Sequence, residues 1–166
     1  MWFLLPAVAF LALMAAAVLR VGGPPAPGDE APAFTAPRLE GEGTVALADF
    51  EGRPVVLNFW ASWCAPCKDE APMLRRAAEE FDGRVEIVGV NIKDSRTDAI
   101  AFAEEEGLGY EHVRDEGGDI ERDYGLTGQP ETFFIDANGE IVEHVNGPLP
   151  EDTFFRLIDV LVTRGN

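Results

Sequence analysis

The stretch NFWASWCAPCKDEAP, residues 58–72, contains both cysteines of the chain, Cys64 and Cys67. Residues 58–60 are the last three of an almost uninterrupted apolar run, PVVLNFW. This run has the length of a strand and is typical of a central strand covered on both faces. After the cysteines, apolar residues recur at helical spacing as far as Phe81. The stretch is therefore predicted to join a buried strand to a helix, with a Cys-x-x-Cys motif where the helix begins.

This position gives the two cysteines a defined chemistry. The unpaired N–H groups and the dipole at a helix N-terminus stabilise a thiolate, so Cys64 is expected to be the more reactive sulfur. Cys67 is expected one helical turn along the same face, close enough to attack a mixed disulfide at Cys64 and release the product. Pro66 suits the first turn, where its missing N–H is not needed. The motif is predicted to perform dithiol–disulfide exchange.

Two other uses of the cysteines have to be weighed. A structural zinc site needs four ligands, and the only histidines, His112 and His144, lack the spacing of a zinc finger. A purely structural disulfide would close so short a loop that it adds little stability. Redox exchange is favoured over both, with no metal and with no cofactor other than the redox-active disulfide between Cys64 and Cys67.

The composition indicates one globular domain with an acidic surface. The chain has 166 residues, of which 46% are hydrophobic and 26% are charged, and this is enough to build a core without disulfide staples. Its 30 acidic and 13 basic side chains give a formal net charge of −17. A nucleic-acid partner would require basic side chains against its phosphates, so that class of function is excluded. The acidity is interpreted as a solvated surface.

Residues 1–21 are predicted to form a transmembrane anchor. They contain no charged side chain before Arg20, and twenty helical residues rise about 30 Å, the thickness of a bilayer core. A cleaved signal peptide would instead show a basic start and a shorter apolar core. Residues 22–32 are rich in proline and glycine and are predicted to be a semi-extended linker. A single domain is predicted to occupy residues 33–166.

The rest of the chain alternates between strand and helix patterns. The predicted elements are a second buried strand at residues 85–92, a helix at residues 97–106 that stops at Gly107, a short strand at residues 111–114, a short helix at residues 120–124, a hairpin at residues 132–145 that turns at Asn138 and Gly139, and a closing amphipathic helix that includes Phe154, Leu157, Ile158 and Leu161. This order predicts an α/β fold with a mixed central sheet.

Several segments carry a resemblance to a known family. FWASWCAPC, with Trp60 and Trp63 ahead of the cysteines, closely resembles the active site of the thioredoxin superfamily. GDEAPAF resembles the family's entry segment, and YGLTGQPETFFID followed by NGEI resembles its second signature. PETF and the predicted anchor make the chain similar to the CcmG/DsbE group, the thiol:disulfide interchange proteins of cytochrome c biogenesis, within the wider TlpA/ResA family. The resemblance implies a thioredoxin-like fold with helices on both faces of the sheet.

The resemblance also implies roles for residues at matching positions. Cys64 would be the attacking nucleophile and Cys67 the resolving thiol. Pro130 corresponds to the family's cis-proline, whose preceding backbone lies beside the dithiol and pairs with substrate. Gln129, just before it, departs from the small or β-branched residue that is usual there, so the family's fine substrate preference does not carry over. The residues implied to contact substrate are Trp63, Pro66, Gln129 and Glu131.

Some neighbouring residues have more than one interpretation. Asn58 is interpreted as a hydrogen-bonded core amide that supports the site, together with Trp60. Glu70 follows Cys67 by one turn; it is either an ordinary exposed helix acid or, as the resemblance implies, an active-site glutamate that manages protons, and the second is favoured. Glu131 is either a solvated acid at a strand edge or a second carboxylate close to the dithiol, and the sequence does not favour one interpretation over the other.

Acidic side chains beside the cysteines bear on the direction of electron flow. Negative charge opposes a thiolate at Cys64, whereas a strong oxidant needs a very stable thiolate in its reduced form. The chain is therefore predicted to be a reductant. By resemblance, its client is the oxidised Cys-x-x-Cys-His haem-attachment site of apocytochrome c, or a thiol protein of cytochrome c maturation, and a CcdA/DsbD-like membrane protein returns the electrons.

The chemistry and the resemblance place the domain on the periplasmic side of the inner membrane, in a single-pass protein, although Arg20 taken alone would favour the other orientation.

Three alternative functions remain to be compared with this one. One alternative is a general extracytoplasmic thiol reductase or oxidase with other clients. Another is a peroxiredoxin, which would need threonine where Ala61 stands. A third is a redox-inert binding module, which would not need both cysteines.

Overall fold

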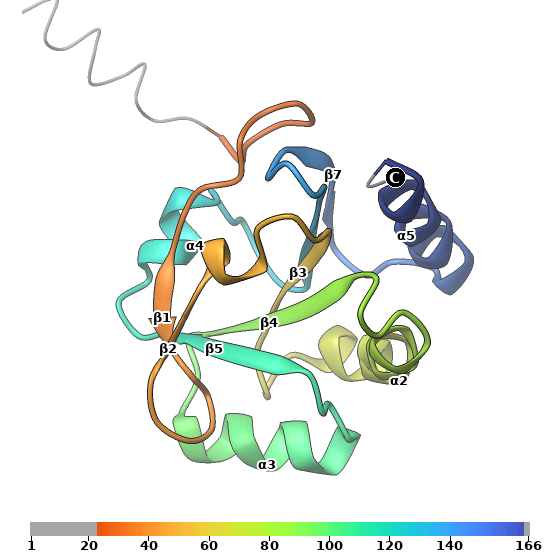
Figure 1. Ribbon diagram of the computed structural model, residues 1–166. Coiled ribbons are helices and arrows are strands. Elements are labelled where there is room, and N and C mark those ends of the chain that lie inside the picture. Colours follow the sequence, from red (N-terminus) through yellow and green to blue (C-terminus); the bar gives the residue numbers. More distant parts are fainter. Residues whose placement is uncertain (1–22, 165–166) are drawn as a thin grey trace, which may run out of the picture.

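The computed structural model describes residues 23–164, which fold around a five-stranded sheet (Figure 1). The predicted transmembrane anchor, residues 1–21, lies outside this range. Within residues 23–164, no helix has the length and apolarity that crossing a membrane requires.

The central sheet is mixed and has the strand order β5-β4-β3-β6-β7. Its strands are β3 (Val55–Trp60), β4 (Glu86–Ile92), β5 (Glu111–Asp115), β6 (Glu131–Ile135) and β7 (Ile141–Asn146). β3, β4 and β5 run parallel to one another, whereas β6 and β7 pair in the antiparallel sense. All 6 residues of β3 are buried, because β3 has a strand on each side and a packed layer on each face. The predictions of a central strand and a mixed sheet are confirmed.

Three helices cover one face of the sheet. They are α2 (Ala65–Glu80), α3 (Arg96–Glu106) and α5 (Glu151–Arg164). α2 and α5 share a core cluster with Phe134 of β6, while α3 packs against Trp60 at the end of β3. The opposite face carries the short α4 (Asp119–Asp123). Helices therefore lie on both faces, as the resemblance implied, but most of the helical cover is on one of them.

The second face is completed by a segment that the sequence analysis did not predict. It consists of β1 (Thr35–Pro37), β2 (Thr44–Ala46) and the 3-10 helix η1 (Leu47–Phe50). The side chains of Phe34, Val45 and Phe50 pack into the same core cluster as Phe59. Strands of three residues are too short to show a hydrophobic period, which explains why the pattern did not reveal them.

The chain between Gly28 and Leu39 covers both edges of the sheet. The N–H of Gly28 donates to the carbonyl of Ile141 at 2.8 Å on the β7 side, and the N–H of Leu39 donates to the carbonyl of His112 at 2.8 Å on the β5 side. Edge strands without such cover would present unpaired backbone groups to other chains. Pairing with the sheet thus begins before residue 33, within the segment that was predicted to be a linker.

The predicted turns lie where glycine was expected to make them. Gly107 ends α3 in the left-handed region at φ +68°, and Gly139 lies in the β6–β7 hairpin at φ +85°. The hairpin loop is longer than a two-residue turn, because β6 ends at Ile135 and β7 begins at Ile141. The Asp136 carboxylate caps this loop by accepting from the N–H groups of Asn138 and Glu140 at 2.8 and 3.1 Å. These contacts position β7 against β6.

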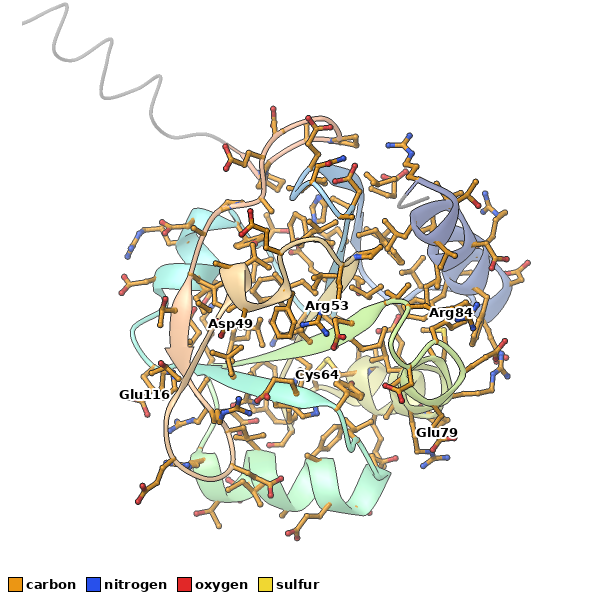
Figure 2. All side chains as sticks on the ribbon, in the orientation of Figure 1. Asp49, Arg53, Cys64, Glu79, Arg84 and Glu116 are labelled. Carbon is orange, nitrogen blue, oxygen red and sulfur yellow. A yellow bond between two sulfur atoms is a disulfide. The ribbon has the colours of Figure 1, made fainter. Side chains whose placement is uncertain are left out.

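The charged side chains lie mainly on the outside of this framework. Glu79, Arg84 and Glu116 project outward from the ribbon (Figure 2). Cys64, in contrast, lies inside, where α2 meets the sheet, and only 4% of its surface is exposed. The acidic side chains therefore lie on the surface of the domain, whereas the dithiol is buried.

Candidate active site

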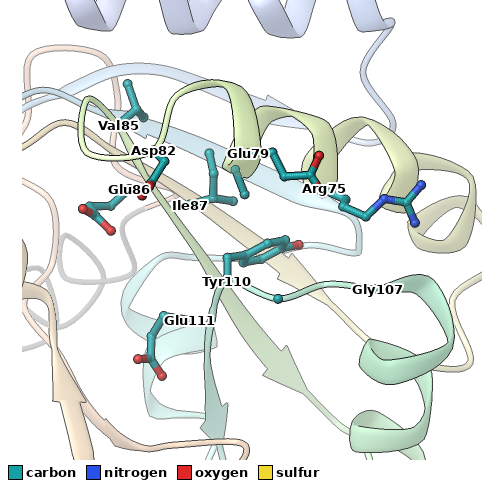
Figure 3. Close-up of a pocket in the computed structure, with 11 residues that line it drawn as sticks. Arg75, Glu79, Asp82, Val85, Glu86, Ile87, Gly107, Tyr110 and Glu111 are labelled. Atoms are coloured by element: carbon teal, nitrogen blue, oxygen red, sulfur yellow. The ribbon is translucent and has the colours of Figure 1, made fainter.

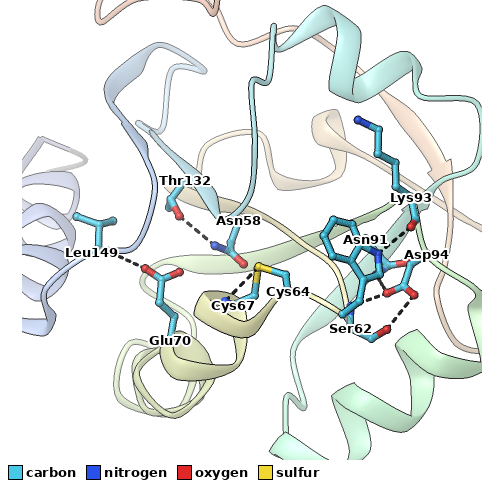
Figure 4. The surroundings of a disulfide bond; sticks show 11 residues. Asn58, Ser62, Cys64, Cys67, Glu70, Asn91, Lys93, Asp94, Thr132 and Leu149 are labelled. Carbon is cyan, nitrogen blue, oxygen red and sulfur yellow. Dashed lines mark hydrogen bonds between the residues drawn. A yellow bond between two sulfur atoms is a disulfide. The ribbon is translucent and has the colours of Figure 1, made fainter.

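The two cysteines lie where the sequence predicted, at the junction of β3 and α2. They form a disulfide with an S–S distance of 1.99 Å, so the structure represents the oxidised form. Cys64 is the N-cap residue of α2, and its Sγ accepts a hydrogen bond from the N–H of Cys67 at 3.2 Å (Figure 4). The N-terminus of α2 therefore directs a backbone donor toward the sulfur of Cys64, which is the environment that favours a thiolate after reduction.

The surface beside the disulfide is provided by Trp63. Cys64 and Cys67 are each only 4% exposed, whereas Trp63 is 59% exposed. The indole N–H of Trp63 donates to the carbonyl of Lys93 at 3.0 Å, which holds the ring in place at the surface. Trp63 therefore presents an exposed aromatic surface next to the buried sulfurs, and the loop after β4 fixes its ring.

The proline loop is brought to the same end of the sheet by strand pairing. The Gln129–Pro130 peptide bond is cis, as the resemblance implied. Pro130 directly precedes β6, whose first residue, Glu131, pairs with Phe59 near the end of β3. Because β3 leads into Cys64, this pairing places the proline loop beside the dithiol although the two are far apart in the sequence. Gln129 is partly exposed, and Pro130 is buried.

Two buried polar side chains lie beneath the disulfide. The amide of Asn58 donates to the Thr132 hydroxyl at 3.0 Å, and both residues are 1% exposed (Figure 4). The hydrogen-bonded core amide expected at Asn58 is thus present. Trp60, on the same side of β3, is 2% exposed and stacks on Phe102 of α3 with ring centroids 5.1 Å apart. Both residues fix the end of the strand from which the active-site turn begins.

Glu70 is a buried carboxyl on the α2 face that also carries Cys67. It is 5% exposed and accepts one hydrogen bond, from the N–H of Leu149 at 2.5 Å. Burial disfavours the carboxylate and raises the pKa of Glu70 to about 7, while the Leu149 N–H opposes that shift. The interpretation as an ordinary exposed acid is therefore wrong. Near neutral pH this carboxyl can hold or release a proton one turn from Cys67.

Glu131 lies elsewhere than either sequence interpretation expected. It is 0% exposed, so it is not a solvated acid at a strand edge. Successive side chains of a strand point to opposite faces, and Thr132 points to the face that carries the disulfide, so Glu131 points away from it. Its carboxylate accepts from the N–H groups of Thr127 and Gly128 at 2.7 and 2.9 Å and meets His144 Nε2 at 2.8 Å. Glu131 therefore braces the loop ahead of Pro130 and, in this conformation, presents no surface to a substrate.

Several residues near the site were missed by the sequence analysis. Asp94 accepts hydrogen bonds from both the backbone N–H and the hydroxyl of Ser62, next to Trp63. Tyr110 has a buried hydroxyl without a hydrogen-bond partner, and burial together with the charge of Glu70 raises its pKa. No local pattern signals these residues, because their contacts join segments that are distant in the chain.

A large surface pocket lies apart from the dithiol. It has a volume of about 490 Å³ and opens between α2 and the β4–β5 edge, where Arg75, Glu79 and Tyr110 are among the residues that line it (Figure 3). Neither cysteine contributes to its wall. Among residues 23–164, no group of three or more histidine, cysteine or acidic side chains is arranged to hold a metal ion.

Comparison with known proteins identifies similar sequences and structures. The sequence model of the AhpC/TSA family matches residues 27–144. The thiol:disulfide interchange protein HelX of Rhodobacter capsulatus is 42% identical over 137 residues, which cover 81% of this chain and 76% of that protein. The thiol-disulfide oxidoreductase ResA of Oceanobacillus iheyensis is 39% identical over 129 residues, which cover 75% of this chain and 67% of that protein. A crystal structure described as a thiol:disulfide interchange protein DsbE from Chlorobium tepidum matches with a TM-score of 0.77 and 31% identity, covering 82% of this chain and 97% of that one.

Proposed function

Because the chain belongs to the AhpC/TSA family, and within it to the thioredoxin-like disulfide oxidoreductases of the CcmG/DsbE and ResA kind, we propose that it is a membrane-anchored reductant of cytochrome c maturation. The observation that carries this proposal is the Cys64–Cys67 disulfide at the N-terminus of α2. Its client would be the oxidised Cys-x-x-Cys-His site of apocytochrome c or a thiol protein that serves this site.

The exchange runs in two displacement steps. In the reduced enzyme the Cys64 thiolate attacks one sulfur of the client disulfide, a mixed disulfide forms, and the other client sulfur leaves as a thiolate. The Cys67 thiolate then attacks Cys64 Sγ and releases the second client thiolate. The client has gained two electrons and, after protonation, two protons, and the enzyme is left with the Cys64–Cys67 disulfide. A CcdA/DsbD-like membrane dithiol protein would return the electrons by the reverse exchange.

Two properties of Glu70 support this proposal: it can take up a proton from Cys67, and its charge favours a protein that acts as a reductant. Its pKa of about 7 lets it accept the proton that Cys67 loses before its attack. When ionised, its buried charge opposes a thiolate on the neighbouring dithiol, which lowers the stability of the reduced form. A protein with a less stable thiolate is a better reductant and a poorer oxidant.

Client contact is proposed for the exposed and half-buried residues around the disulfide. Trp63 and Pro66 flank Cys64, and the Gln129–Pro130 backbone precedes β6 on the other side. An extended client segment would pair with this backbone in strand fashion and lay its cysteine against Cys64. Residues 1–21 would anchor the domain to the inner membrane with the dithiol on the periplasmic side.

A trapping experiment tests the client. In the full-length chain, Cys67→Ser removes the second attack, so the mixed disulfide at Cys64 accumulates and the captured protein can be identified by mass spectrometry. Recovery of apocytochrome c or of maturation thiol proteins would support the proposal, with Cys64→Ser/Cys67→Ser as the control that captures nothing. Capture of unrelated periplasmic proteins would instead favour a general extracytoplasmic reductase.

The reduction potential tests the direction of electron flow. Equilibration of the full-length protein with glutathione buffers should give a potential below about −180 mV, on the reducing side of disulfide isomerases. A value close to the roughly −120 mV of strong periplasmic oxidants would refute the reducing role.

A further inference from the structure

Two loops meet at the end of the sheet where the disulfide lies. β3 and β4 are parallel neighbours, and Trp60 at the end of β3 pairs with Asn91 of β4. Parallel neighbours end at the same edge of a sheet, so the chain that continues to Cys64 runs beside the loop that continues from β4 to α3. That second loop contains Lys93 and Asp94.

The turn ahead of the nucleophile is tied to this loop through Asp94. The turn is closed by the N–H of Cys64, which donates to the carbonyl of Ala61 at 3.1 Å. At its centre, Ser62 donates its N–H to Asp94 Oδ2 at 2.6 Å and its hydroxyl to Asp94 Oδ1 at 2.9 Å (Figure 4). The buried amide of Asn91 donates to Asp94 Oδ2 at 3.0 Å and orients the carboxylate.

The second central residue of the turn, Trp63, is tied to Lys93. Its indole N–H donates to the Lys93 carbonyl at 3.0 Å. Lys93 has φ +49°, and among the described residues other than glycine no second one has a positive φ. A side chain in this left-handed region costs free energy, and such strain persists only where the surroundings enforce it. The strained residue thus lies next to Asp94, where its carbonyl meets the tryptophan.

We infer that Asp94 is a positioning residue for disulfide exchange, which holds the turn of residues 61–64 so that Trp63 stands as a fixed contact surface beside Cys64. A ring that is 59% exposed would otherwise sample several rotamers, and a client would have to order it on binding. The inference rests on the oxidoreductase activity of the dithiol and does not depend on the identity of the client.

The test compares a peptide disulfide with a small disulfide. In the full-length chain, Asp94→Ala should lower kcat/KM for an oxidised peptide about tenfold, mostly through KM, because the charge-assisted hydrogen bonds from Ser62 are lost and the turn that carries Trp63 is no longer held. Reduction of hydroxyethyl disulfide, which is too small to need Trp63, should change by less than about twofold. Asp94→Asn keeps an oxygen that accepts from Ser62 and should recover most of the activity. The control Asp159→Ala removes an exposed carboxylate on α5 and should leave both rates unchanged.

A double-mutant cycle separates positioning from a general structural role. If Asp94 acts through Trp63, Asp94→Ala should cause no further loss in kcat/KM once Trp63→Ala is present. An equal loss in both backgrounds, an equal loss for both substrates, or no loss at all would each overturn the inference. Because the substrates are generic, failure of the trapping experiment to capture cytochrome c maturation proteins would leave this result standing.

Discussion

Two glutamates are buried on opposite faces of the same sheet, and their surroundings differ sharply. Glu70, on the helical face beside the disulfide, is 5% exposed and accepts one hydrogen bond, from Leu149. Glu131, on the other face, is 0% exposed and has four donors around it, from Thr127, Gly128 and His144. The two carboxyls are thus almost equally buried, but they differ in the number of donors around them.

The difference shows that the donors around a buried carboxylate decide what it can do. At Glu70 the loss of hydration is offset by one N–H, and the pKa rises to about 7. At Glu131 three of the four donors come from the loop ahead of Pro130, so removing the carboxylate would leave part-buried N–H groups of this loop unpaired. The first carboxyl is available for proton transfer, and the second holds the proline loop in place.

The largest effect is expected from Glu131→Ala. It removes a fully buried carboxylate that accepts from four part-buried donors, and the free energy of unfolding should fall by about 3 kcal/mol. Urea denaturation of the full-length chain measures this loss. Glu131→Gln keeps one acceptor oxygen and should lose less than half as much. If Glu131→Ala were as stable as the wild type, the role of Glu131 as a brace would be wrong.

The next effect in size is expected from Glu70→Gln, and it concerns the rate of disulfide reduction and not the stability. The amide can still accept from Leu149 but cannot carry a proton, so the rate of disulfide reduction at pH 7 should fall by roughly thirtyfold, without any loss of folding stability at that pH. The pH–rate profile should also lose its inflection near pH 7. Glu79→Gln, an exposed acid on the same helix, is the matched control. A normal rate and profile in Glu70→Gln would remove Glu70 from the mechanism.

The pH dependence of stability sharpens the same contrast. The pKa of Glu70 rises from 4.5 to about 7 on folding, so between these values the folded chain keeps a proton that the unfolded chain has lost. Its contribution to stability is therefore present below pH 4.5 and is lost as the pH rises through 7, by at most roughly 2 kcal/mol after allowance for residual solvent. The wild type minus Glu70→Gln difference in unfolding free energy, measured from pH 4 to 8, should show this fall. A flat difference would contradict the raised pKa.

The smallest effect is expected from His144→Ala. The imidazole provides one of the donors to Glu131 and stacks on Phe133 with ring centroids 4.1 Å apart, whereas the donors from residues 127 and 128 stay in place. The free energy of unfolding should fall by about 1 kcal/mol, which denaturant titration resolves. His144→Gln retains an N–H donor and should recover part of the loss. A loss as large as that of Glu131→Ala would mean that His144, not the loop, is the main partner.

Sequence patterns predicted the features that depend on neighbouring residues. The apolar run of β3 and the helical spacing after Cys64 identified the junction that carries the disulfide, because burial on both faces and amphipathic packing leave a period in the sequence. The cis-proline at Pro130 came from the resemblance, since the base rate of cis X-Pro bonds would not have justified it. The strands at residues 35–37 and 44–46 were not predicted, because they are too short to show a period.

By itself, the sequence determined the class of fold, the position of the reactive dithiol and the family to which the chain belongs, since these depend on local periodicity, on spacing and on motifs. Only the tertiary structure decided which carboxyl lies beside the disulfide, which one braces the proline loop, and that Asp94 holds Ser62. The physical reason is that a buried polar group takes its pKa and its role from donors on other segments, and strand pairing and helix packing bring those donors to it.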